Sequence, residues 1–339
     1  MSTIPANHPA VSVVMPVYNA APYLQEALDS IRQQTYQDFE VVAVNDGSTD
    51  GSREILVAQD WSQLRIIDQK NAGQSAAINR GVGESCGQFI KIVDADDWIN
   101  PTHLEAQISA VRETEGCVAA CRWGDFRDNP RAVQARCEQV DRDYADPLEW
   151  LVDSLTHDEG MMGGWRWLIP RDVWDRAGGY DVRLGLNNDF HASIAIMLSA
   201  AGVRLASDAV YGYRNGIPGV LSSSKSRKAF ESALLTTELG CELLLQRENS
   251  ERIRRICADR FQRWAFDFFP EYRDLTERAE EQAAALGGST QPFPGGRLGQ
   301  RLAGLIGWKN VRRLQGFASR YGWNAVRACK RRLRERRLH

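Results

Sequence analysis

The first hundred residues alternate between apolar runs and longer segments with helical spacing. Strands are predicted from the apolar, β-rich runs at 11–18, 39–46, 64–68 and 89–94. Helices are predicted from the patterns at 22–34, 48–59, 74–85 and 101–113. Strands and helices that alternate in this way are typical of a parallel sheet with helices on both faces.

Polar side chains gather where three of these predicted strands end. The first strand ends near Tyr18, the second at Asp46, and the fourth runs into Asp94, Asp96 and Asp97. Ligands of such sheets bind beyond the carboxyl ends of the strands, so these groups are expected to line one crevice. The three neighbouring carboxylates repel one another, and a divalent cation between them and substrate phosphates would balance their charge. The alternative is that Asp96 and Asp97 cap the helix that follows.

Other patterns are missing from the sequence. No Gly-x-Gly-x-x-Gly follows a predicted strand and no P-loop occurs, so a glycine-rich phosphate cradle is not supported. The N-terminus lacks the basic start and apolar core of a secretory signal. The apolar stretch at 192–203 is shorter than the roughly 20 residues that span a bilayer. The seven irregularly spaced cysteines are expected to be reduced thiols.

Four stretches together resemble the family 2 glycosyltransferases of GT-A fold. They are "VSVVMPVYNAAPYLQEALDSIRQQTYQDFEVVAVNDGSTDGS", "NAGQSAAINRGVGESCGQFIKIVDADDW", "GGYDVRLGLNNDFHASIAI" and, more loosely, "YGYRNGIPGVLSS". The resemblance covers residues 10–225 and implies an α/β domain with a Rossmann-like, mostly parallel sheet. It also implies inverting, metal-dependent transfer of a sugar from a nucleotide diphosphate sugar, with UDP-hexose as the expected donor. The acceptor would be a hydroxyl of a saccharide or of a lipid-linked molecule in surface or exopolysaccharide synthesis.

The resemblance assigns roles to single residues. Nucleotide-sugar binding is expected of Pro16, Tyr18, Asp46, Asn71, Gly73, Asn79, Asp94 and Asp96. Within this set, Pro16 and Tyr18 would line the nucleobase pocket and Asp46 would accept a hydrogen bond from the base. Asp94-Ala95-Asp96 matches the family's DxD motif, and Asp96 together with Asp97 would bind Mn²⁺ or Mg²⁺.

Asp189 is the expected catalytic base, because the family carries an acid shortly after a turn that here reads Gly-Gly-Tyr-Asp (178–181). It would take the proton of the acceptor hydroxyl. Asn188 stands where the family has another acid, and the family's histidine is missing from "YRNGIPGVLS", which leaves the third metal ligand open. A structural alternative makes Asp189 the N-cap of the following helix.

Acceptor binding is expected of Trp165, Trp167 and Asn188, with the indole rings stacking on sugars. The alternative is that both rings pack in the core. The Gln-x-x-Arg-Trp signature of processive synthases is absent, which favours a single-addition enzyme.

The strand and helix alternation stops near residue 226. Helices are predicted at 228–248, 251–272 and 274–287, and a breaker-rich linker follows at 287–296. We therefore expect a GT-A domain at 1–225, a helical extension and linker at 226–296, and a basic amphipathic tail at 297–339.

The tail carries 13 basic residues and one acid, although the whole chain has a formal net charge of only −2. Its helically spaced apolar residues among Arg and Lys are typical of a helix on an anionic membrane surface. A packed hairpin or a protein partner is the main alternative, and no nucleic-acid partner is expected. The expected location is the cytoplasm, with peripheral contact to the inner membrane.

Two other functions remain open at this point. One is a non-catalytic GT-A relative that binds a nucleotide sugar or a partner, which Asn188 and the missing histidine would suit. The other is a sugar nucleotidyltransferase, which would need a Gly-rich loop with Arg and Lys where this chain has "MPVYNAAPY".

Overall fold

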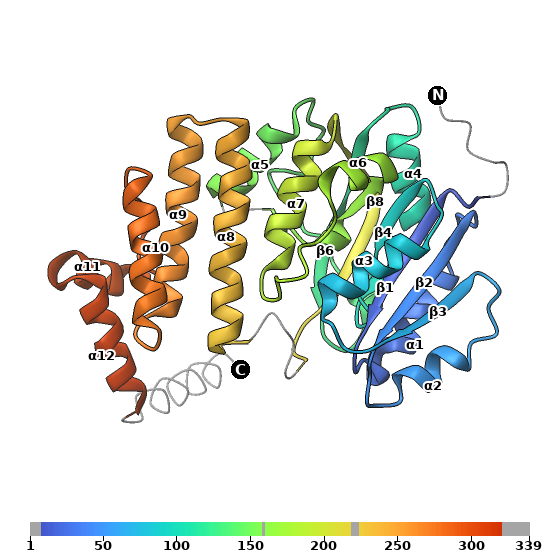
Figure 1. Cartoon of the computed structure of the whole chain (residues 1–339), viewed down its shortest axis with the longest axis horizontal. Coiled ribbons are helices and arrows are strands. Elements are labelled where there is room, and N and C mark those ends of the chain that lie inside the picture. Colours follow the sequence, from blue (N-terminus) through green and yellow to red (C-terminus); the bar gives the residue numbers. More distant parts are fainter. Residues whose placement is uncertain (1–7, 158–159, 218–223, 321–339) are drawn as a thin grey trace, which may run out of the picture. The chain divides into compact units, whose positions relative to one another are not determined.

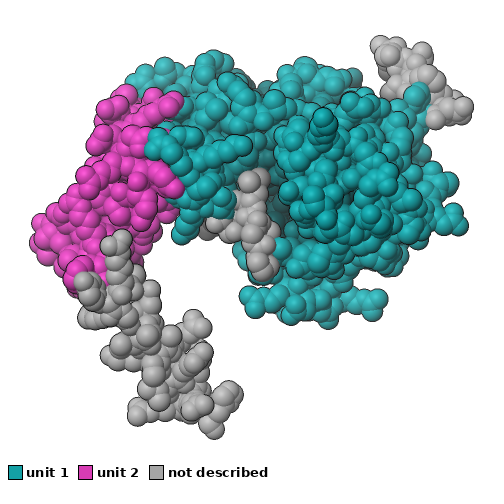
Figure 2. Space-filling view, turned by 60° about the horizontal axis from the view of Figure 1, so that its bottom comes forward, with its two compact units in different colours: residues 1–256 teal, residues 257–339 magenta. Residues whose placement is uncertain are grey.

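A computed structural model of the chain describes residues 8–157, 160–217 and 224–320. The chain divides into two compact units, residues 1–256 and 257–339 (Figure 2). The division falls within helix α9 (Glu251–Phe268), so it differs from the boundaries expected at 225 and 296. The first unit includes helix α8 (Arg227–Arg247), which the sequence pattern assigned to a separate extension.

A mixed sheet of eight strands lies at the centre of the first unit (Figure 1). The strands are β1 (Val11–Val17), β2 (Phe39–Asp46), β3 (Leu64–Gln69), β4 (Phe89–Ile92), β5 (Trp98–Ile99), β6 (Cys117–Phe126), β7 (Trp167–Pro170) and β8 (Gly202–Arg214). Their order is β3-β2-β1-β4-β7-β6-β8-β5. The four N-terminal strands pair in parallel, as predicted. Strand β7 is antiparallel to both β4 and β6, and β5 is antiparallel to β8, so the second half of the sheet is mixed.

Helices cover both faces of this sheet, as the alternating pattern predicted (Figure 1). The helices of the first unit are α1 (Ala21–Arg32), α2 (Ser52–Val57), α3 (Gln74–Glu84), α4 (His103–Val111), α5 (Pro147–His157), α6 (Arg171–Ala177), α7 (Asn188–Ser199) and α8, of which α8 packs against α7. Short 3₁₀ turns occur at Pro130–Ala132 and Gly164–Arg166.

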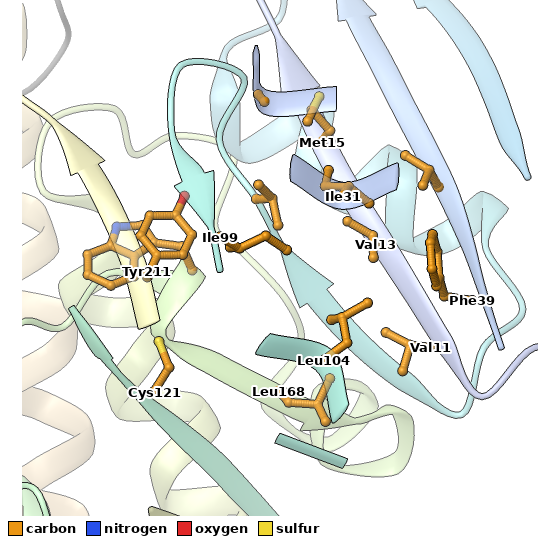
Figure 3. Packing of buried hydrophobic residues seen from close by; sticks show 14 of the residues in the cluster. Val11, Val13, Met15, Ile31, Phe39, Ile99, Leu104, Cys121, Leu168 and Tyr211 are labelled. Atoms are coloured by element: carbon orange, nitrogen blue, oxygen red, sulfur yellow. The ribbon is translucent and has the colours of Figure 1, made fainter. Parts of the chain in front are cut away.

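Alternate residues of β1 face opposite helical layers, as successive side chains of a strand must. On one face Val13 belongs to the same core cluster as Ile31 of α1 and Leu104 of α4 (Figure 3). On the other face Val14 meets α3, where a Cβ on Gly81 would lie only 2.5 Å from Val14 Cγ1. With both faces covered, the ends of β1, β2 and β4 remain available for ligands at one edge of the sheet.

The second unit is helical and has a small core of its own. It contains the rest of α9, α10 (Arg273–Ala285), α11 (Gly296–Ile306) and α12 (Trp308–Arg320). Phe266, Phe293 and Val311 are buried in its core, and Ala303 and Trp308 pack against them. Residues 321–339, the last part of the expected basic tail, lie outside the described residues. None of the helices that the structure describes combines the length and apolar character needed to cross a bilayer.

Candidate functional site

Asp46, at the end of β2, holds the loop that precedes α3. Its carboxylate is only 2% exposed and accepts hydrogen bonds from the backbone N–H groups of Ala72 (2.8 Å) and Gly73 (2.9 Å). The side chain of Gln69 donates a third bond (2.7 Å). Gly73 adopts φ 90°, a conformation that favours glycine. Asp46 therefore organises this loop, and the expected bond to a nucleobase would be additional.

Other residues that were expected to bind the nucleotide sugar lie at the same edge. Pro16 is half-buried in β1, Tyr18 follows it with 53% of its surface exposed, and Asn71 is exposed in the loop before α3. The ends of β1 and β2 are tied together, because the backbone N–H of Asn19 donates to Ser48 Oγ (3.1 Å). The ring of Tyr18 is therefore accessible to a ligand beside the Asp46 loop.

The aspartate turn after β4 is anchored by β8. Asp97 is 1% exposed, and its Oδ2 accepts from the Tyr211 hydroxyl (2.9 Å) while its Oδ1 accepts from the Arg214 backbone N–H (2.7 Å). The same hydroxyl accepts from the backbone N–H of Asp94 (3.2 Å). The turn is thus fixed by two residues of a strand far along the chain.

These contacts correct both sequence interpretations of Asp97. It was expected to bind the metal, but both carboxylate oxygens are bonded inside the protein and have almost no exposed surface. The alternative that Asp96 and Asp97 cap the next helix is also wrong, because α4 begins at His103 with Thr102 as its N-cap. Asp97 instead holds the turn that presents Asp94 and Asp96.

Negative charge accumulates at this turn. Burial, followed by the charges of Asp96 and Asp189, raises the pKa of Asp94 to about 8. Burial also raises the pKa of Asp96, an effect that the neighbouring Arg214 opposes. Two crowded carboxylates fit a hard cation such as Mg²⁺ or Mn²⁺, which is commonly held by one or two carboxylates plus substrate phosphates. The described residues contain no cluster of three or more His, Cys, Asp or Glu that could enclose a metal.

Arg214 is a residue of this region that sequence reasoning missed. Its Nε donates to the Asp96 carbonyl (2.7 Å), its Nη1 donates to the Arg127 carbonyl (2.9 Å), and it forms an ion pair with Glu26. It also lines a groove of about 1090 Å³ between α1, β5 and the ends of β6 and β8. The only signal in the sequence was its position in the loosely matching stretch 211–223, of which 218–223 lie outside the described residues. A ligand in the groove would share this arginine with the aspartate turn.

Asp189, the expected base, lies in the first turn of α7. Its Oδ1 accepts from the Tyr180 hydroxyl (2.7 Å) and from the Gly164 backbone N–H (3.1 Å), whereas no described residue donates to Oδ2. Burial raises the pKa of Asp189, and these two hydrogen bonds oppose the rise. The N-cap of α7 is Asn187, so the alternative that Asp189 caps this helix is wrong. Oδ2 is therefore the atom available to accept a proton.

Gln74 connects the aspartate turn to the helix that carries Asp189. Its Nε2 donates to Asp94 Oδ1 (3.0 Å), and its Oε1 accepts from the side chain of Asn188 (3.4 Å). Asn188 is buried and also donates to Ser75 Oγ (3.1 Å), so it positions α7 and has little surface for an acceptor. Gln74 was overlooked although it stands within the matching stretch that begins at Asn71.

Comparison with known proteins identifies the domain that contains Asp46, Gln74 and the aspartate turn, whereas Asp189 and Arg214 lie beyond the matched residues. Residues 12–173 match the family model described as glycosyl transferase family 2. These residues form a family 2 glycosyltransferase domain. The predicted family and the predicted transferase class are therefore confirmed.

Curated relatives carry similar descriptions. This glycosyltransferase is 28% identical over 256 residues to "Putative glycosyltransferase EpsH" of Bacillus subtilis, covering 73% of this chain and 72% of the relative. It is 27% identical over 236 residues to "Uncharacterized glycosyltransferase EpsJ" of the same organism, covering 67% of each chain. A shorter match, 41% over 123 residues, joins 35% of this chain to 40% of "Glycosyltransferase GlyG" of Streptococcus pneumoniae.

Solved structures confirm the predicted GT-A fold. S. aureus TarS 1–349, crystallised with UDP-GlcNAc, matches with a TM-score of 0.68 at 17% identity and covers 92% of each chain. The mannosyltransferase PcManGT from Pyrobaculum calidifontis, in complex with GDP-Man and Mn²⁺, matches with a TM-score of 0.52 at 18% identity. That match covers 93% of this chain and 85% of the other.

Two contacts support the loop of the glycosyltransferase that precedes Asp189. Asn79 donates from Nδ2 to the Tyr180 carbonyl (2.7 Å) and accepts the Tyr180 N–H at Oδ1 (2.9 Å). Ser232 of α8 accepts from the Gly185 N–H (2.7 Å) and donates to the Leu186 carbonyl (3.3 Å). Asn79 was expected to bind the nucleotide sugar, but both polar ends of its amide are hydrogen-bonded to the Tyr180 backbone.

The two tryptophans of the glycosyltransferase expected to bind an acceptor are core residues. Trp167 is fully buried, with its ring 4.9 Å from that of Trp150 in a T-shaped arrangement. Trp165 is also buried and stacks on Tyr211 with ring centroids 4.3 Å apart. Neither ring has a face to offer a sugar, so this expectation is corrected in favour of core packing. Trp165 instead supports the tyrosine that anchors the aspartate turn.

Proposed function

We propose that the protein transfers a sugar, with inversion, from a UDP-hexose to a hydroxyl of a saccharide or lipid-linked acceptor. The observation that carries this proposal is the geometry around Asp189. Its Oδ1 is held by Tyr180 and Gly164, its Oδ2 receives no bond from the described residues, and Gln74 links its helix to Asp94. A base beside a cluster of donor-binding carboxylates is what a single displacement at an anomeric carbon requires.

In this proposal Asp189 Oδ2 takes the proton of the acceptor hydroxyl as its oxygen bonds to the anomeric carbon. The bond from that carbon to the diphosphate oxygen breaks, and UDP leaves with the electron pair. The raised pKa of Asp189 makes it a stronger base than an exposed carboxylate and brings its titration closer to neutral pH. Tyr180 and Gly164 fix the orientation of the carboxylate.

Asp94 and Asp96 would hold Mn²⁺ or Mg²⁺. When bound, the ion acts as a Lewis acid that stabilises the departing diphosphate. The chain's own contribution is to hold the two aspartates in place through Asp97, Tyr211 and Arg214. Mn²⁺ in the complex of the mannosyltransferase PcManGT supports metal use.

The donor is inferred from several sources. UDP-GlcNAc in the TarS structure favours a UDP-sugar, and GDP-Man in the PcManGT structure keeps a guanine donor as the alternative. Tyr18, Pro16 and Asn71 would contact the base and ribose from the edge of the sheet. The family resemblance supports a role in surface or exopolysaccharide synthesis, on the cytoplasmic side of a membrane.

The test is UDP release from a panel of UDP-sugars, with Mn²⁺, Mg²⁺ or EDTA, for wild type and Asp189→Asn. Slow hydrolysis of the donor is the readout, because it needs no acceptor. Metal-dependent release from one sugar, lost in Asp189→Asn and kept in the exposed control Asp172→Asn, is the expected result. Full activity in Asp189→Asn would overturn the assignment of the base.

Calorimetry distinguishes the non-catalytic alternative. Binding of UDP with metal, together with no turnover of any donor when membrane extract is added as acceptor, would indicate a binding protein. Binding of GDP in place of UDP would redirect the donor panel without changing the roles of Asp94, Asp96 and Asp189.

A further inference from the structure

Helices α11 and α12 expose an unusual amount of apolar surface. Six of the nine large hydrophobic side chains that are exposed in the described part of the chain belong to them. The six are Leu298, Leu302, Leu305, Ile306, Leu314 and Phe317. Leu298, Leu302 and Leu305 are spaced four and three residues apart, so they share one face of α11. Leu298 is 72% and Leu305 is 81% exposed, which marks this face as the most open apolar surface described.

The opposite side of these helices already has its partners. Trp308 packs edge-on against Phe266 with ring centroids 4.9 Å apart, and Val311 is buried in the same small core. Lys309 forms an ion pair with Glu280 at 2.6 Å. The fold of this unit therefore does not depend on the exposed leucines, and they are available for another surface.

Basic side chains border the leucines. Arg297 and Arg301 directly precede Leu298 and Leu302, and both arginines are exposed. The 13 basic residues and single acid of 297–339 continue the same charge along the chain. The buried centre of a protein interface is depleted in charged residues, whereas an interfacial helix on anionic lipid places basic groups beside its apolar face. The charge pattern thus favours a lipid surface over a protein.

We propose that the exposed leucine face of α11, with Leu314 of α12, inserts into the interface of an anionic bilayer while Arg297 and Arg301 contact lipid phosphates. This deepens the proposed function, on which it rests, because a lipid-linked acceptor would be presented at that surface. The helices lie on the membrane and do not cross it, in keeping with the absence of a membrane-crossing helix among the described residues.

The test is sedimentation of the full chain with vesicles of phosphatidylcholine containing 30% phosphatidylglycerol, and with pure phosphatidylcholine. Wild type is expected to bind the anionic vesicles and to release them as salt is raised. The double variant Leu298→Ser with Leu305→Ser should weaken vesicle binding by about a hundredfold. Each substitution removes the free energy gained when a largely exposed leucine side chain moves from water into the bilayer interface. Arg297→Gln or Arg301→Gln should each weaken it about fivefold at low salt.

The matched control is Val57→Ser with Val182→Ser, which removes two exposed apolar side chains (57% and 60%) from the first unit. The control should bind vesicles as wild type does. Equal binding of the Leu298/Leu305 variant and wild type would mean that charge alone holds the protein and would overturn the insertion. No vesicle binding by wild type, or a wild-type dimer in lipid-free sedimentation that the leucine variant abolishes, would also overturn it.

Donor hydrolysis separates this inference from the proposed function. The leucine variant should hydrolyse the donor in the absence of vesicles as wild type does, because its changes lie outside the first unit. Loss of vesicle binding with normal donor hydrolysis would mean that the substitutions affect membrane binding alone. Normal vesicle binding by a protein that hydrolyses no donor would count against the proposed function alone.

Discussion

Replacing Tyr180 with phenylalanine should shift the acidic limb of the pH–rate profile to higher pH. The substitution keeps the buried ring and removes the hydroxyl that donates to Asp189 Oδ1 at 2.7 Å. A base must be deprotonated to act, so the rate rises as the pH passes the pKa of Asp189. Burial has already raised this pKa, and Tyr180 is the larger of the two hydrogen-bond donors that oppose the rise.

The size of the shift follows from the strength of the lost bond. A hydrogen bond to a charged group contributes about 1.5–3 kcal/mol, and one pKa unit corresponds to about 1.36 kcal/mol. Loss of the bond should therefore destabilise the charged form of Asp189 by about 1.5–3 kcal/mol and raise its pKa further. The Gly164 N–H remains on the same oxygen and limits the change. At a pH well above the pKa of Asp189 in both wild type and Tyr180→Phe, the variant should approach the wild-type rate.

The assay is metal-dependent donor hydrolysis between about pH 5 and pH 9 for wild type and Tyr180→Phe. Tyr144→Phe is the matched control, since it removes a buried tyrosine's hydrogen bond to Asp153 (2.8 Å) in another part of the first unit. In this control the midpoint of the acidic limb of the pH–rate profile should be the same as in wild type. A midpoint in Tyr180→Phe that stays in place, or that moves to lower pH, would refute the reasoning. A uniform loss of rate at every pH would assign Tyr180 a structural role only.

Three further substitutions test other parts of the structure. Gly164→Ala would make a Cβ overlap with the Tyr180 hydroxyl and should cut donor hydrolysis on the order of 10²-fold by displacing that hydroxyl; a rate close to wild type would contradict this geometry. Arg214→Lys keeps the charge but loses the planar contacts to the Asp96 carbonyl and its neighbours. Metal-dependent UDP binding measured by calorimetry should then fall at least about tenfold, and unchanged binding would show that charge alone suffices. Lys91 is fully buried, and burial lowers its pKa to about 8, so the folded state binds its proton less tightly than the unfolded state does. Lys91→Met should therefore stabilise the protein by about 1 kcal/mol in urea unfolding at pH 7, with a gain that shrinks as the pH rises above 8; an equal gain at pH 7 and pH 9.5 would argue against the buried charge.

The N-terminal half of the sheet could be predicted because its signals are local. The expected strand at 39–46 coincides with β2, and the expected helix at 74–85 differs from α3 by a single residue. Each element has its own periodicity, and the regular alternation fixes a parallel order. The second half could not be predicted in this way. Strand β7 has only four residues, and β8 lies between β6 and β5, which depends on pairings between distant segments.

The candidate site was predictable to the same extent. Asp46 and Asp94 were expected at strand ends, and the sheet brings those ends to one edge. The direction of each side chain was not predictable, because it depends on partners elsewhere in the chain. Asp97 faces Tyr211 of β8, and Asn79 is bonded to Tyr180, 101 residues later. Residue type and spacing alone do not distinguish a carboxylate that anchors a turn from one that binds a ligand.

The bond between Asp97 and the Arg214 backbone also sets an order of events during synthesis. The two residues are 117 positions apart, and a ribosome adding about 5–20 residues per second takes about 6 to 23 s to cover that distance. During this interval strands β1, β2, β3 and β4 can already pair with one another. The aspartate turn, however, still lacks β8, the strand that fixes it. A fragment ending at residue 173, where the family match ends, would remain permanently in that state. Ribosome-bound chains stalled before and after β8 should therefore differ in their ability to retain a nucleotide.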